Sequence, residues 1–394
     1  MTTQEKLHTI STQLNDFFVE RDEEIHGLLL AGLTGSNIIF LGSPGIAKSL
    51  LITSFSKLMG NAKIFKKLVN KYTIPEELFG PFKIAELRNN VFERNIEDTL
   101  VDADIGFLDE VFKANSGILN ALLDIMNERE FRNGTKILKV PLKFLAGASN
   151  EIPEEDDGLA AMYDRFLLKF MSNPIIEDSN FLQMINSTVP NYTPIISMDE
   201  LRAVQKDINA VTMSAEIGAL FNALRNKLRS EGLAATDRTY RNSINILKAE
   251  AYLNDRNFID SQDFEVLKHV LWTDPDKRRQ VYSLILEIAN PIMKEIEELY
   301  DEALTMQSEY TAKSQANKGK KGNKDDVNLT GLDVAAKMSN ISQKISVKMK
   351  LMNDAKMNIT KVKKILNHID QLRRGIIGDI TSMDGFFETF KQKP

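Results

Sequence analysis

The hydrophobic pattern of the first part of the chain combines helical spacing with short apolar runs. Three runs, at 37–41, 104–108 and 143–148, have the length of buried strands, and stretches with helical spacing separate them. Buried strands that alternate with helices are typical of a parallel sheet covered by helices. The pattern therefore predicts an α/β domain over residues 1–176.

Beyond this domain the strand pattern ends. Residues 177–280 show the periodicity of short helices, which predicts a separate, smaller helical domain. Over 281–394 the apolar positions repeat every three or four residues in two arms, the second running from 338 to 369. Such sustained spacing favours a coiled-coil hairpin, which could serve as a stalk, a docking site or an oligomer contact. Between the arms, near 312–330, a stretch rich in lysine, glycine and asparagine predicts a flexible loop.

Composition narrows the classes of function. The chain has 394 residues, a net charge of −5 and a pI near 5.7, which argue against a dedicated nucleic-acid binder. It has no cysteine, so disulfides, thiolate metal sites and cysteine nucleophiles are excluded. The four histidines are scattered without metal-ligand spacing. The sequence shows neither a signal peptide nor an apolar run of membrane-spanning length, so we expect a cytoplasmic protein.

A glycine-rich turn follows the first apolar run and opens a helical stretch. Phosphate binding requires inward-pointing backbone N–H groups, which glycines permit, and the positive end of a helix dipole. We expect Lys48 to reach the β- and γ-phosphates of ATP and Ser49 to hold Mg²⁺. Ala47 stands where the general pattern has glycine, and taken alone the segment could be a turn-rich connection. The candidate nucleotide-binding residues are Gly42, Ser43, Pro44, Gly45, Ile46, Ala47, Lys48, Ser49 and Leu50.

The second apolar run ends in two acidic residues, Asp109 and Glu110. In a sheet that carries a phosphate-binding loop, this position puts Asp109 beside the Mg²⁺ ion and Glu110 where it can polarise an attacking water. The alternative is a helix N-terminus, where acids are favourable for electrostatic reasons. Together with the glycine-rich turn, the pair favours ATP hydrolysis.

Four segments in order resemble the MoxR branch of the AAA+ superfamily, most closely the RavA-type regulatory ATPases. They cover much of residues 20–170, and the family's own phosphate-binding loop carries alanine before the lysine, as Ala47 does here. The resemblance implies an AAA+ P-loop αβα core with a parallel sheet, followed by a helical lid and a C-terminal helical region. The segments are LLLAGLTGSNIIFLGSPGIAKS, KYTIPEELFGP, IGFLDEVFKANSGILNALLDIMNEREFRNG and LAGASNEIPEEDDGLAAMYDRFLLKF.

The resemblance also implies roles for single residues. Asn150 resembles sensor 1, an amide that positions the water against the γ-phosphate. Arg165 resembles the arginine finger, which reaches into the nucleotide site of the neighbouring subunit and stabilises charge in the transition state. The alternative for Arg165 is an ion pair at a helix end with Asp164 or Glu155.

A second arginine has a role by resemblance. Arg238 resembles sensor 2 of the lid, and Arg241 is the competing choice because residues three apart lie on one helix face. Segments 73–100 and 129–139 match family elements that face the ring pore and touch clients, although a solvated hairpin is an equal alternative for any single residue there.

The family works as homo-oligomeric rings, so we expect a ring, most simply a hexamer, that binds ATP and Mg²⁺ and remodels a partner protein. In the family this partner often carries a von Willebrand factor A (vWA) domain. RavA-type proteins also carry an inserted β-rich module in their C-terminal helices. Residues 311–331 leave too little room for such a module, so we expect it to be absent.

Two other classes of function stay open from sequence. The first is a nucleic-acid motor or loader, which the acidic balance disfavours but the lysines between 318 and 324 keep open. The second is a nucleotide-gated scaffold with little turnover. The presence of Asp109, Glu110, Asn150 and Arg165 argues against this scaffold.

Overall fold

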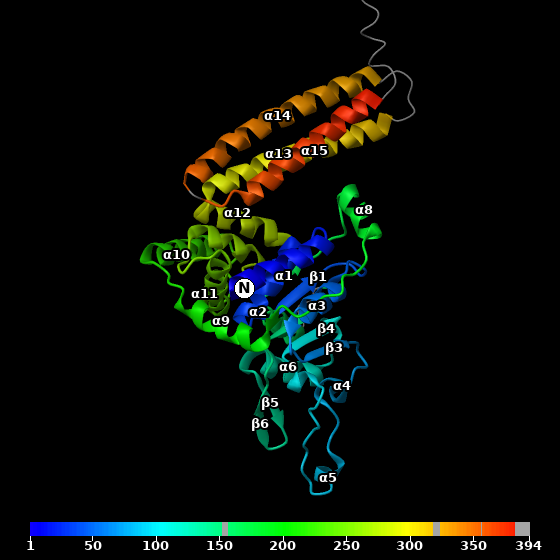
Figure 1. The fold of residues 1–394 in the computed structure, drawn as a ribbon, viewed down its shortest axis with the longest axis vertical. Coiled ribbons are helices and arrows are strands. Elements are labelled where there is room, and N and C mark those ends of the chain that lie inside the picture. The colour runs from blue at the N-terminus through cyan, green and yellow to red at the C-terminus, as the bar shows by residue number, and fades with distance from the viewer. Residues whose placement is uncertain (152–156, 318–323, 356, 383–394) are drawn as a thin grey trace, which may run out of the picture. The chain divides into compact units, whose positions relative to one another are not determined.

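The chain folds as two compact units, Met1–Tyr282 and Ser283–Pro394. In the part of the chain that the structure describes, no helix is long and apolar enough to cross a membrane. The computed structural model (Figure 1) describes residues 1–151, 157–317, 324–355 and 357–382.

A five-stranded sheet lies at the centre of the first unit. Its strand order is β3-β4-β7-β1-β8, and every neighbouring pair is parallel. The three apolar runs form the adjacent strands β4, β7 and β1, so the predicted α/β fold is confirmed. The strands are β1 (Ile38–Leu41), β3 (Ile64–Leu68), β4 (Ile105–Asp109), β7 (Phe144–Ser149) and β8 (Leu168–Met171).

Helices lie on both faces of this sheet, as Figure 1 shows. Local sequence sets their ends: Thr2 forms a capping box with Glu5 at the start of α1, and the Asn115 side chain accepts the Ile118 N–H at the start of α6. The core helices are α1 (Thr3–Phe17), α2 (Asp22–Thr34), α3 (Lys48–Lys57), α6 (Ser116–Glu128) and α7 (Asp157–Tyr163), with 3₁₀ turns η1 (Leu100–Asp102) and η2 (Val111–Lys113).

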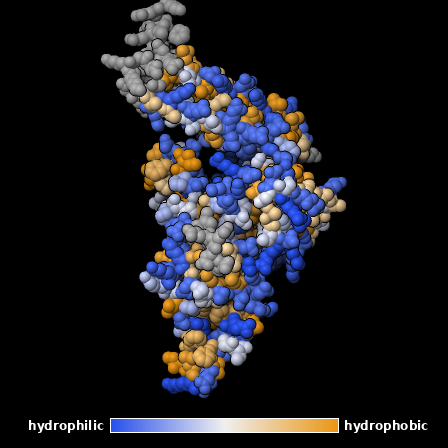
Figure 2. Space-filling model, turned by 180° about the vertical axis from the view of Figure 1, so that it is seen from behind, coloured by the Kyte–Doolittle hydropathy of each residue, from blue (hydrophilic) through white to orange (hydrophobic). Residues whose placement is uncertain are grey.

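Two insertions extend from one end of this unit, the lower end in Figure 1. The Arg94 N–H donates to the Asn133 side chain at 2.6 Å, and Lys136 pairs with Glu93 at 2.6 Å, so the two insertions lie side by side. Figure 2 shows apolar side chains gathered at this end. Their elements are α4 (Pro75–Phe79), α5 (Ile84–Leu87), β5 (Glu130–Asn133) and β6 (Lys136–Lys139), the last two paired as an antiparallel hairpin.

The lid that follows the sheet is helical, as predicted. Ser197, Ser214 and Thr236 each accept a backbone N–H and so start α9, α10 and α11. The lid elements are α8 (Asp178–Asn186), β9 (Ile196–Ser197), α9 (Met198–Ala210), α10 (Ala215–Ser230), α11 (Asp237–Leu253), η3 (Ser261–His269) and η4 (Pro275–Lys277); β9 pairs in parallel with β2 (Met59–Gly60) of the core.

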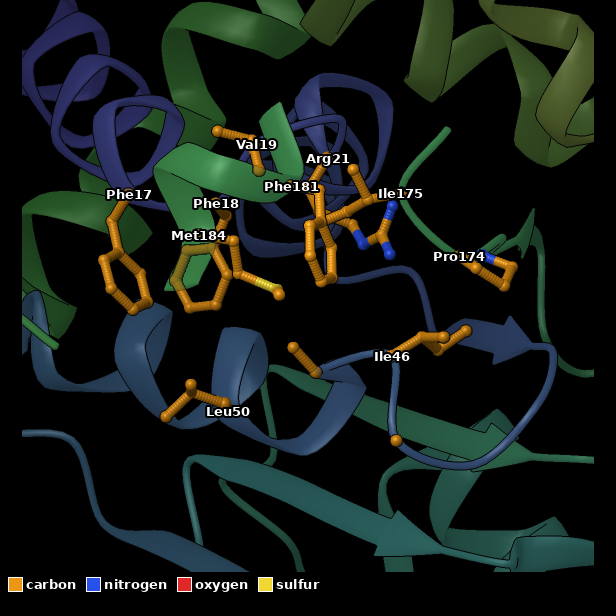
Figure 3. A pocket seen from close by; sticks show the side chains of 12 residues that line it. Phe17, Phe18, Val19, Arg21, Ile46, Leu50, Pro174, Ile175, Phe181 and Met184 are labelled. Carbon is orange, nitrogen blue, oxygen red and sulfur yellow. The ribbon is translucent and has the colours of Figure 1, made fainter. Parts of the chain in front are cut away.

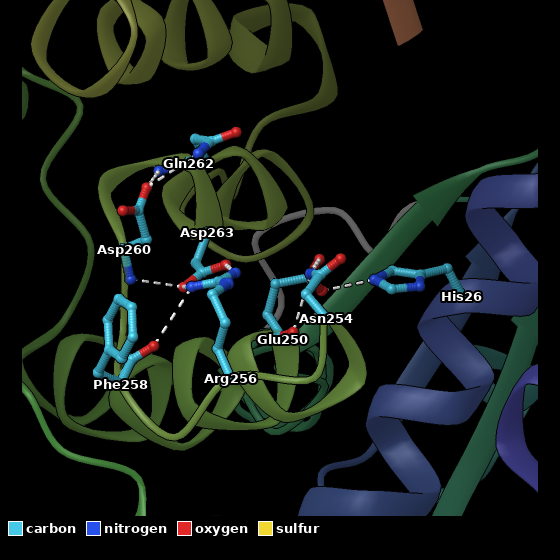
Figure 4. A network of polar contacts seen from close by, with 8 residues as sticks. All are labelled: His26, Glu250, Asn254, Arg256, Phe258, Asp260, Gln262 and Asp263. Carbon is cyan, nitrogen blue, oxygen red and sulfur yellow. Dashed lines mark hydrogen bonds and ion pairs between the residues drawn. The ribbon is translucent and has the colours of Figure 1, made fainter. Parts of the chain in front are cut away.

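Charged and aromatic contacts fasten the lid to the core. His26 of α2 and Glu250 of α11 are joined at 2.5 Å, within the network in Figure 4. Burial alone would lower the pKa of His26, but Glu250 outweighs it and raises that pKa above its ordinary value. The His269 ring stacks on Phe170 of β8 at 4.2 Å, and burial lowers the pKa of His269 to about 3, so it stays neutral. The lid therefore rests on α2 and β8.

In its described residues, the second unit contains three long helices. The predicted helical hairpin is confirmed, but the second arm is not one continuous helix. It breaks after Asp354, and the Asn358 side chain accepts the Thr360 N–H to start a new helix. Asparagine favours such turns, which explains the break. The helices are α13 (Pro291–Asn317), α14 (Lys324–Asp354) and α15 (Thr360–Ser382), after α12 (Arg278–Ala289) at the boundary between the units.

Both ends of the loop predicted near 312–330 are helical in the structure. Helix α13 continues to Asn317 and α14 begins at Lys324. Packing of helices against one another stabilises helical turns in segments whose composition alone disfavours them. Residues 318–323 lie outside the described residues. Lys361 of α15 pairs with Glu297 of α13 at 2.8 Å, and Lys348 of α14 pairs with Glu295 of α13, so both later helices fold back on α13.

Candidate phosphate and base site

The turn between β1 and α3 has the backbone of a phosphate-binding loop. Gly42 has φ 147°, and a Cβ there would lie 2.2 Å from the Ser172 carbonyl oxygen, so only glycine fits. Gly45 has φ 83°. Ala47 also lies in the left-handed region, at φ 64°, which costs a non-glycine residue about 1 kcal/mol. The loop accepts this strain at the residue before Lys48.

Lys48 is held inside this loop by oxygen atoms. Its Nζ donates to the carbonyl oxygens of Gly42 and Ser43 and, at 3.0 Å, to the Asn150 side-chain oxygen. Burial lowers the pKa of Lys48, whereas Asp109 and Glu110 act in the opposite direction. The oxygen atoms around Lys48 therefore orient its ammonium group before an anion binds.

Ser49 and Asp109 meet although they come from different elements. The Ser49 hydroxyl, in the first turn of α3, donates to Asp109 Oδ2 at 2.8 Å, and Asp109 is the last residue of β4. Hydroxyl and carboxylate oxygens at the end of a parallel sheet suit Mg²⁺, which prefers oxygen ligands. The donor set therefore fits the expected metal ion.

Glu110 and Asn150 form the other polar contact of this site. The Asn150 amide donates to Glu110 Oε1 at 2.5 Å, and Lys113 lies 3.3 Å from the other carboxylate oxygen. Glu110 has φ 53°, a strained conformation that is common at functional sites. The structure thus brings together Lys48, Ser49, Asp109, Glu110 and Asn150 at the carboxyl ends of β1, β4 and β7.

An apolar cavity of about 380 Å³ adjoins this cluster. Figure 3 shows that three segments build it: the end of α1 with the turn that follows, the phosphate-binding loop, and the chain leading through α8. Aromatic and aliphatic walls beside a phosphate site suit a planar base. Its lining residues are Phe17, Phe18, Val19, Arg21, Gly45, Ile46, Ala47, Leu50, Pro174, Ile175, Phe181 and Met184.

Of the residues that line this cavity, only Gly45, Ile46, Ala47 and Leu50 were predicted from sequence to lie at the nucleotide. Phe17 and Phe18 sit at the end of an amphipathic helix, where they are indistinguishable from core residues. Helix α8 follows β8 through a connecting segment that carries no recognisable sequence motif. Only the fold brings these segments to the loop.

Arg165 lies at the opposite edge of the sheet from the phosphate cluster. Its carbonyl oxygen accepts the Asn37 side-chain N–H at 3.2 Å, and Asn37 immediately precedes β1, whereas the phosphate-binding loop follows β1. The four residues of β1 span about 13 Å. The Arg165 side chain donates to the Ala161 carbonyl and lies 3.3 Å from Asp164. The ion pair with Asp164 is therefore present, and Glu155 lies outside the described residues.

Arg238 is exposed at the start of α11 and lies near Arg165. Burial lowers the pKa of Arg165, and the charge of Arg238 lowers it further, with Asp164 opposing both. Arg241 is also exposed but is not among the groups that act on Arg165. In the described structure, no hydrogen bond or ion pair joins Arg165 or Arg238 to the phosphate cluster.

Comparison with known proteins places the chain in a family. Residues 5–204 match the family described as the MoxR domain in the MoxR-vWA-beta-propeller ternary systems, and residues 216–285 match the AAA lid domain. The chain belongs to the MoxR family of AAA+ ATPases. Members of this family bind nucleotides, and the RavA subgroup is not distinguished by these matches.

Individual relatives extend the MoxR assignment. An uncharacterised protein of Methanocaldococcus jannaschii is 42% identical over 74% of this chain and 76% of its own length. The chaperone MoxR1 of Mycobacterium tuberculosis is 24% identical over 51% of this chain and 54% of its own length. A crystal structure of a candidate ATPase from Cytophaga hutchinsonii covers 73% of this chain and 95% of its own, with a TM-score of 0.60 and 21% identity, and so supports the fold.

Proposed function

We propose that this MoxR-family protein is an Mg²⁺-dependent ATPase that assembles as a homo-oligomeric ring and remodels a partner protein. Lys48 would hold the β- and γ-phosphates and Ser49 with Asp109 would hold Mg²⁺, which screens phosphate charge and orients the γ-phosphate. Glu110 would polarise the attacking water, and Asn150 would position it. The Asn150–Glu110 contact would have to open for the carboxylate to reach that water.

The observation that carries this proposal is the separation of the two halves of the site. The phosphate cluster follows β1, whereas Arg165 lies before β1 with Arg238 beside it. We therefore infer that a chain does not bring its own arginines to its own phosphates. Head-to-tail neighbours in a ring would supply them, so both arginines are proposed to act on the nucleotide of the adjacent subunit.

The partner is proposed from the family and from the insertions. The family is described from systems that also contain a vWA protein, and MoxR1 is a chaperone, so a vWA-domain protein is the proposed partner. The tip of the insertions exposes Ile84 (72%) and Phe92 (62%) near the basic residues of the β5–β6 hairpin. Apolar side chains beside cations would suit a partly unfolded client at a ring pore. The hexameric state and a RavA-type role belong to the same proposal.

The two alternatives from sequence receive no support from the fold. Three of the lysines that suggested nucleic acid lie at 318–323, outside the described residues, and the fourth, Lys324, begins α14. The net charge of the chain is −5. A scaffold with little turnover would have no use for the Glu110–Asn150 and Arg165–Arg238 pairs. Negligible ATP turnover at every protein concentration would favour that scaffold.

Mixing two inactive variants tests the shared site directly. Glu110→Gln keeps the arginine edge and loses hydrolysis, whereas Arg165→Ala keeps the phosphate edge and lacks the finger. A 1:1 mixture should recover about a quarter of the native rate, because a site is complete only where an Arg165→Ala subunit receives the finger of a Glu110→Gln neighbour. ATPase rate is measured against protein concentration, with size-exclusion chromatography in parallel.

The matched control mixes Glu110→Gln with Lys48→Ala. Both changes damage the phosphate edge, so no pairing of these subunits yields a complete site, and the mixture should stay inactive. A mixture of Glu110→Gln and Arg165→Ala that stays equally inactive, although the subunits co-assemble, would show that the arginine does not act between subunits.

A further inference from the structure

One carboxylate joins two walls of the base cavity. Glu20, in the turn between α1 and α2, accepts the backbone N–H groups of Ile176 and Glu177, each at 2.9 Å, and the Asn180 side-chain N–H at 3.0 Å. All three donors belong to the segment that enters α8. Glu20 therefore holds the start of α8 against the turn that follows α1.

The backbone and charge of Glu20 fit this task. Its φ is 56°, a left-handed conformation that a non-glycine residue adopts at a cost unless the surroundings hold it there. Burial would raise the pKa of Glu20, but the hydrogen bonds from Glu177, Asn180 and Ile176 outweigh it, and the pKa lies below its ordinary value. The ionised carboxylate at the N-terminus of α8 is also favoured by the helix dipole.

Helix α8 has few other attachments. All of its residues are described, none is buried, and its N-cap residue Glu177 makes no side-chain capping bond. The Gln183 side chain donates to the Asp16 carbonyl at 3.3 Å, a second tether to the end of α1. A helix without buried residues depends on such tethers for its position.

Two α8 side chains face the cavity while remaining largely exposed. Phe181 is 50% and Met184 is 40% exposed, and both lie above the phosphate-binding loop in Figure 3. A flat ring placed between them and Ile46 would remove this apolar surface from water. The cavity thus gains a wall only where α8 is correctly seated.

We propose that Glu20 is a positioning residue for the base of the nucleotide: it seats α8 so that Phe181 and Met184 close over the ring. This inference rests on the proposed ATP binding and names what supports the base half of that site. The phosphate half depends on Lys48 and its loop, which make none of these contacts. Loss of Glu20 should therefore weaken recognition of the base and leave recognition of the phosphates intact.

The experiment compares two ligands of the full chain, Mg-ATP and Mg-tripolyphosphate, the second having phosphates but no base. Glu20→Ala should raise the dissociation constant of Mg-ATP about tenfold and leave that of Mg-tripolyphosphate unchanged. Glu20→Gln should fall between, since it keeps one acceptor oxygen. In the ATPase assay KM should rise while kcat is retained, a split that general destabilisation would not give.

Two further variants keep the test decisive. Phe181→Ala changes an exposed wall residue and leaves Glu20 in place. Like Glu20→Ala, it should raise the dissociation constant of Mg-ATP and leave that of Mg-tripolyphosphate unchanged, and it can be measured even if Glu20→Ala fails to fold. Glu77→Ala is the matched control, because Glu77 likewise accepts a backbone N–H at a helix start, from Ile74 at 3.1 Å, but does not line the cavity.

The outcomes separate this inference from the proposed function. If Glu20→Ala and Phe181→Ala weaken the binding of both ligands equally, or of neither, then Glu20 and α8 do not contribute to recognition of the base. If the native chain binds neither ligand, the proposed ATP site itself is wrong. If the native chain binds both and hydrolyses ATP while the two variants match it, the function stands and the role of Glu20 is overturned.

Discussion

The two edges of the central sheet differ in how completely their polar groups are partnered. At the phosphate edge, Lys48 donates to Asn150, Ser49 donates to Asp109, and Asn150 donates to Glu110. At the arginine edge two cations lie close together, so that one lowers the pKa of the other, and among the described residues Asp164 opposes this effect. Placing like charges together is unfavourable unless an anion joins them.

If the proposed function is correct, the phosphate edge is preassembled and the arginine edge is completed by a ligand. A neighbouring subunit's triphosphate would supply the negative charge that Arg165 and Arg238 lack. Changes at the phosphate edge should therefore reduce nucleotide binding, whereas changes at the arginine edge should reduce turnover and leave binding in place.

The largest effect is expected from Arg165→Ala. Removal of a cation that stabilises the transition state should lower kcat about 10³-fold while the ATP dissociation constant stays within a factor of a few. Steady-state ATPase rates and fluorescent-nucleotide titration measure the two quantities. Arg229→Ala, at an exposed arginine of α10, is the control and should match the native chain. Weakened ATP binding without loss of kcat would contradict the division between edges.

Lys48→Ala is expected to have a smaller effect, and to weaken ATP binding where Arg165→Ala lowers kcat. The charge that meets the phosphates disappears, so the ATP dissociation constant should rise about 100-fold, and turnover should fall because the site is empty. Equilibrium titration of Mg-ATP measures this change. Lys57→Ala, at the exposed end of the same helix, is the control. Native affinity in Lys48→Ala would show that phosphate binds elsewhere.

The pair of lid arginines should differ by about tenfold. Because Arg238 and not Arg241 acts electrostatically on Arg165, Arg238→Ala should lower kcat about tenfold, and Arg241→Ala should change it less than twofold. Both variants are assayed at saturating ATP. The reverse order would assign the sensor role to Arg241.

The smallest effect concerns the pair that fastens the lid, and with it Arg238, to the core. His26 is 38% exposed, so solvent screens the pair, and Glu250→Gln should cost about 1 kcal/mol of unfolding free energy. The pKa of Glu250 is lowered by His26 against the effect of burial, so its contribution is lost as pH falls through that lowered pKa. The pKa of His26 is raised, so its contribution is present at low pH and lost as pH rises through the raised value.

The destabilisation by Glu250→Gln should accordingly be largest between about pH 4.5 and 6.5 and smaller at pH 8.5. Urea unfolding at pH 5.5 and 8.5 measures it. Glu231→Gln, which removes an exposed carboxylate near Lys227, serves as the pH-independent control. An equal cost at both pH values would mean that the ionised pair does not hold the lid.

Much of the fold was predictable from local pattern. The three buried runs became the central strands because a strand covered on both faces must be apolar throughout. The edge strands escaped prediction: β3 alternates exposed and half-buried residues, and β8 contains Lys169. The break in the second C-terminal arm was also missed, since its apolar spacing continues across Asn358 and hides the turn.

The candidate site divides in the same way. The phosphate-binding loop and the acidic pair at 109–110 are contiguous in sequence, so their residue types indicate their chemistry. The base cavity, the seat of α8 on Glu20 and the proximity of Arg165 to Arg238 join segments up to some 160 residues apart. The periodicity of a sequence does not reveal such contacts, because it reflects only the secondary structure and burial of each segment taken separately.

The amino-acid sequence by itself determined the class of fold, the helical lid and hairpin, and the residues that follow each central strand. It did so because burial and backbone geometry select residue types locally. Only the tertiary structure decided that Lys48 and Arg165 lie at opposite edges of one sheet and that α8 faces the phosphate-binding loop. Those relations depend on how strands are ordered and how a nearly unburied helix is tethered, and long-range packing sets both.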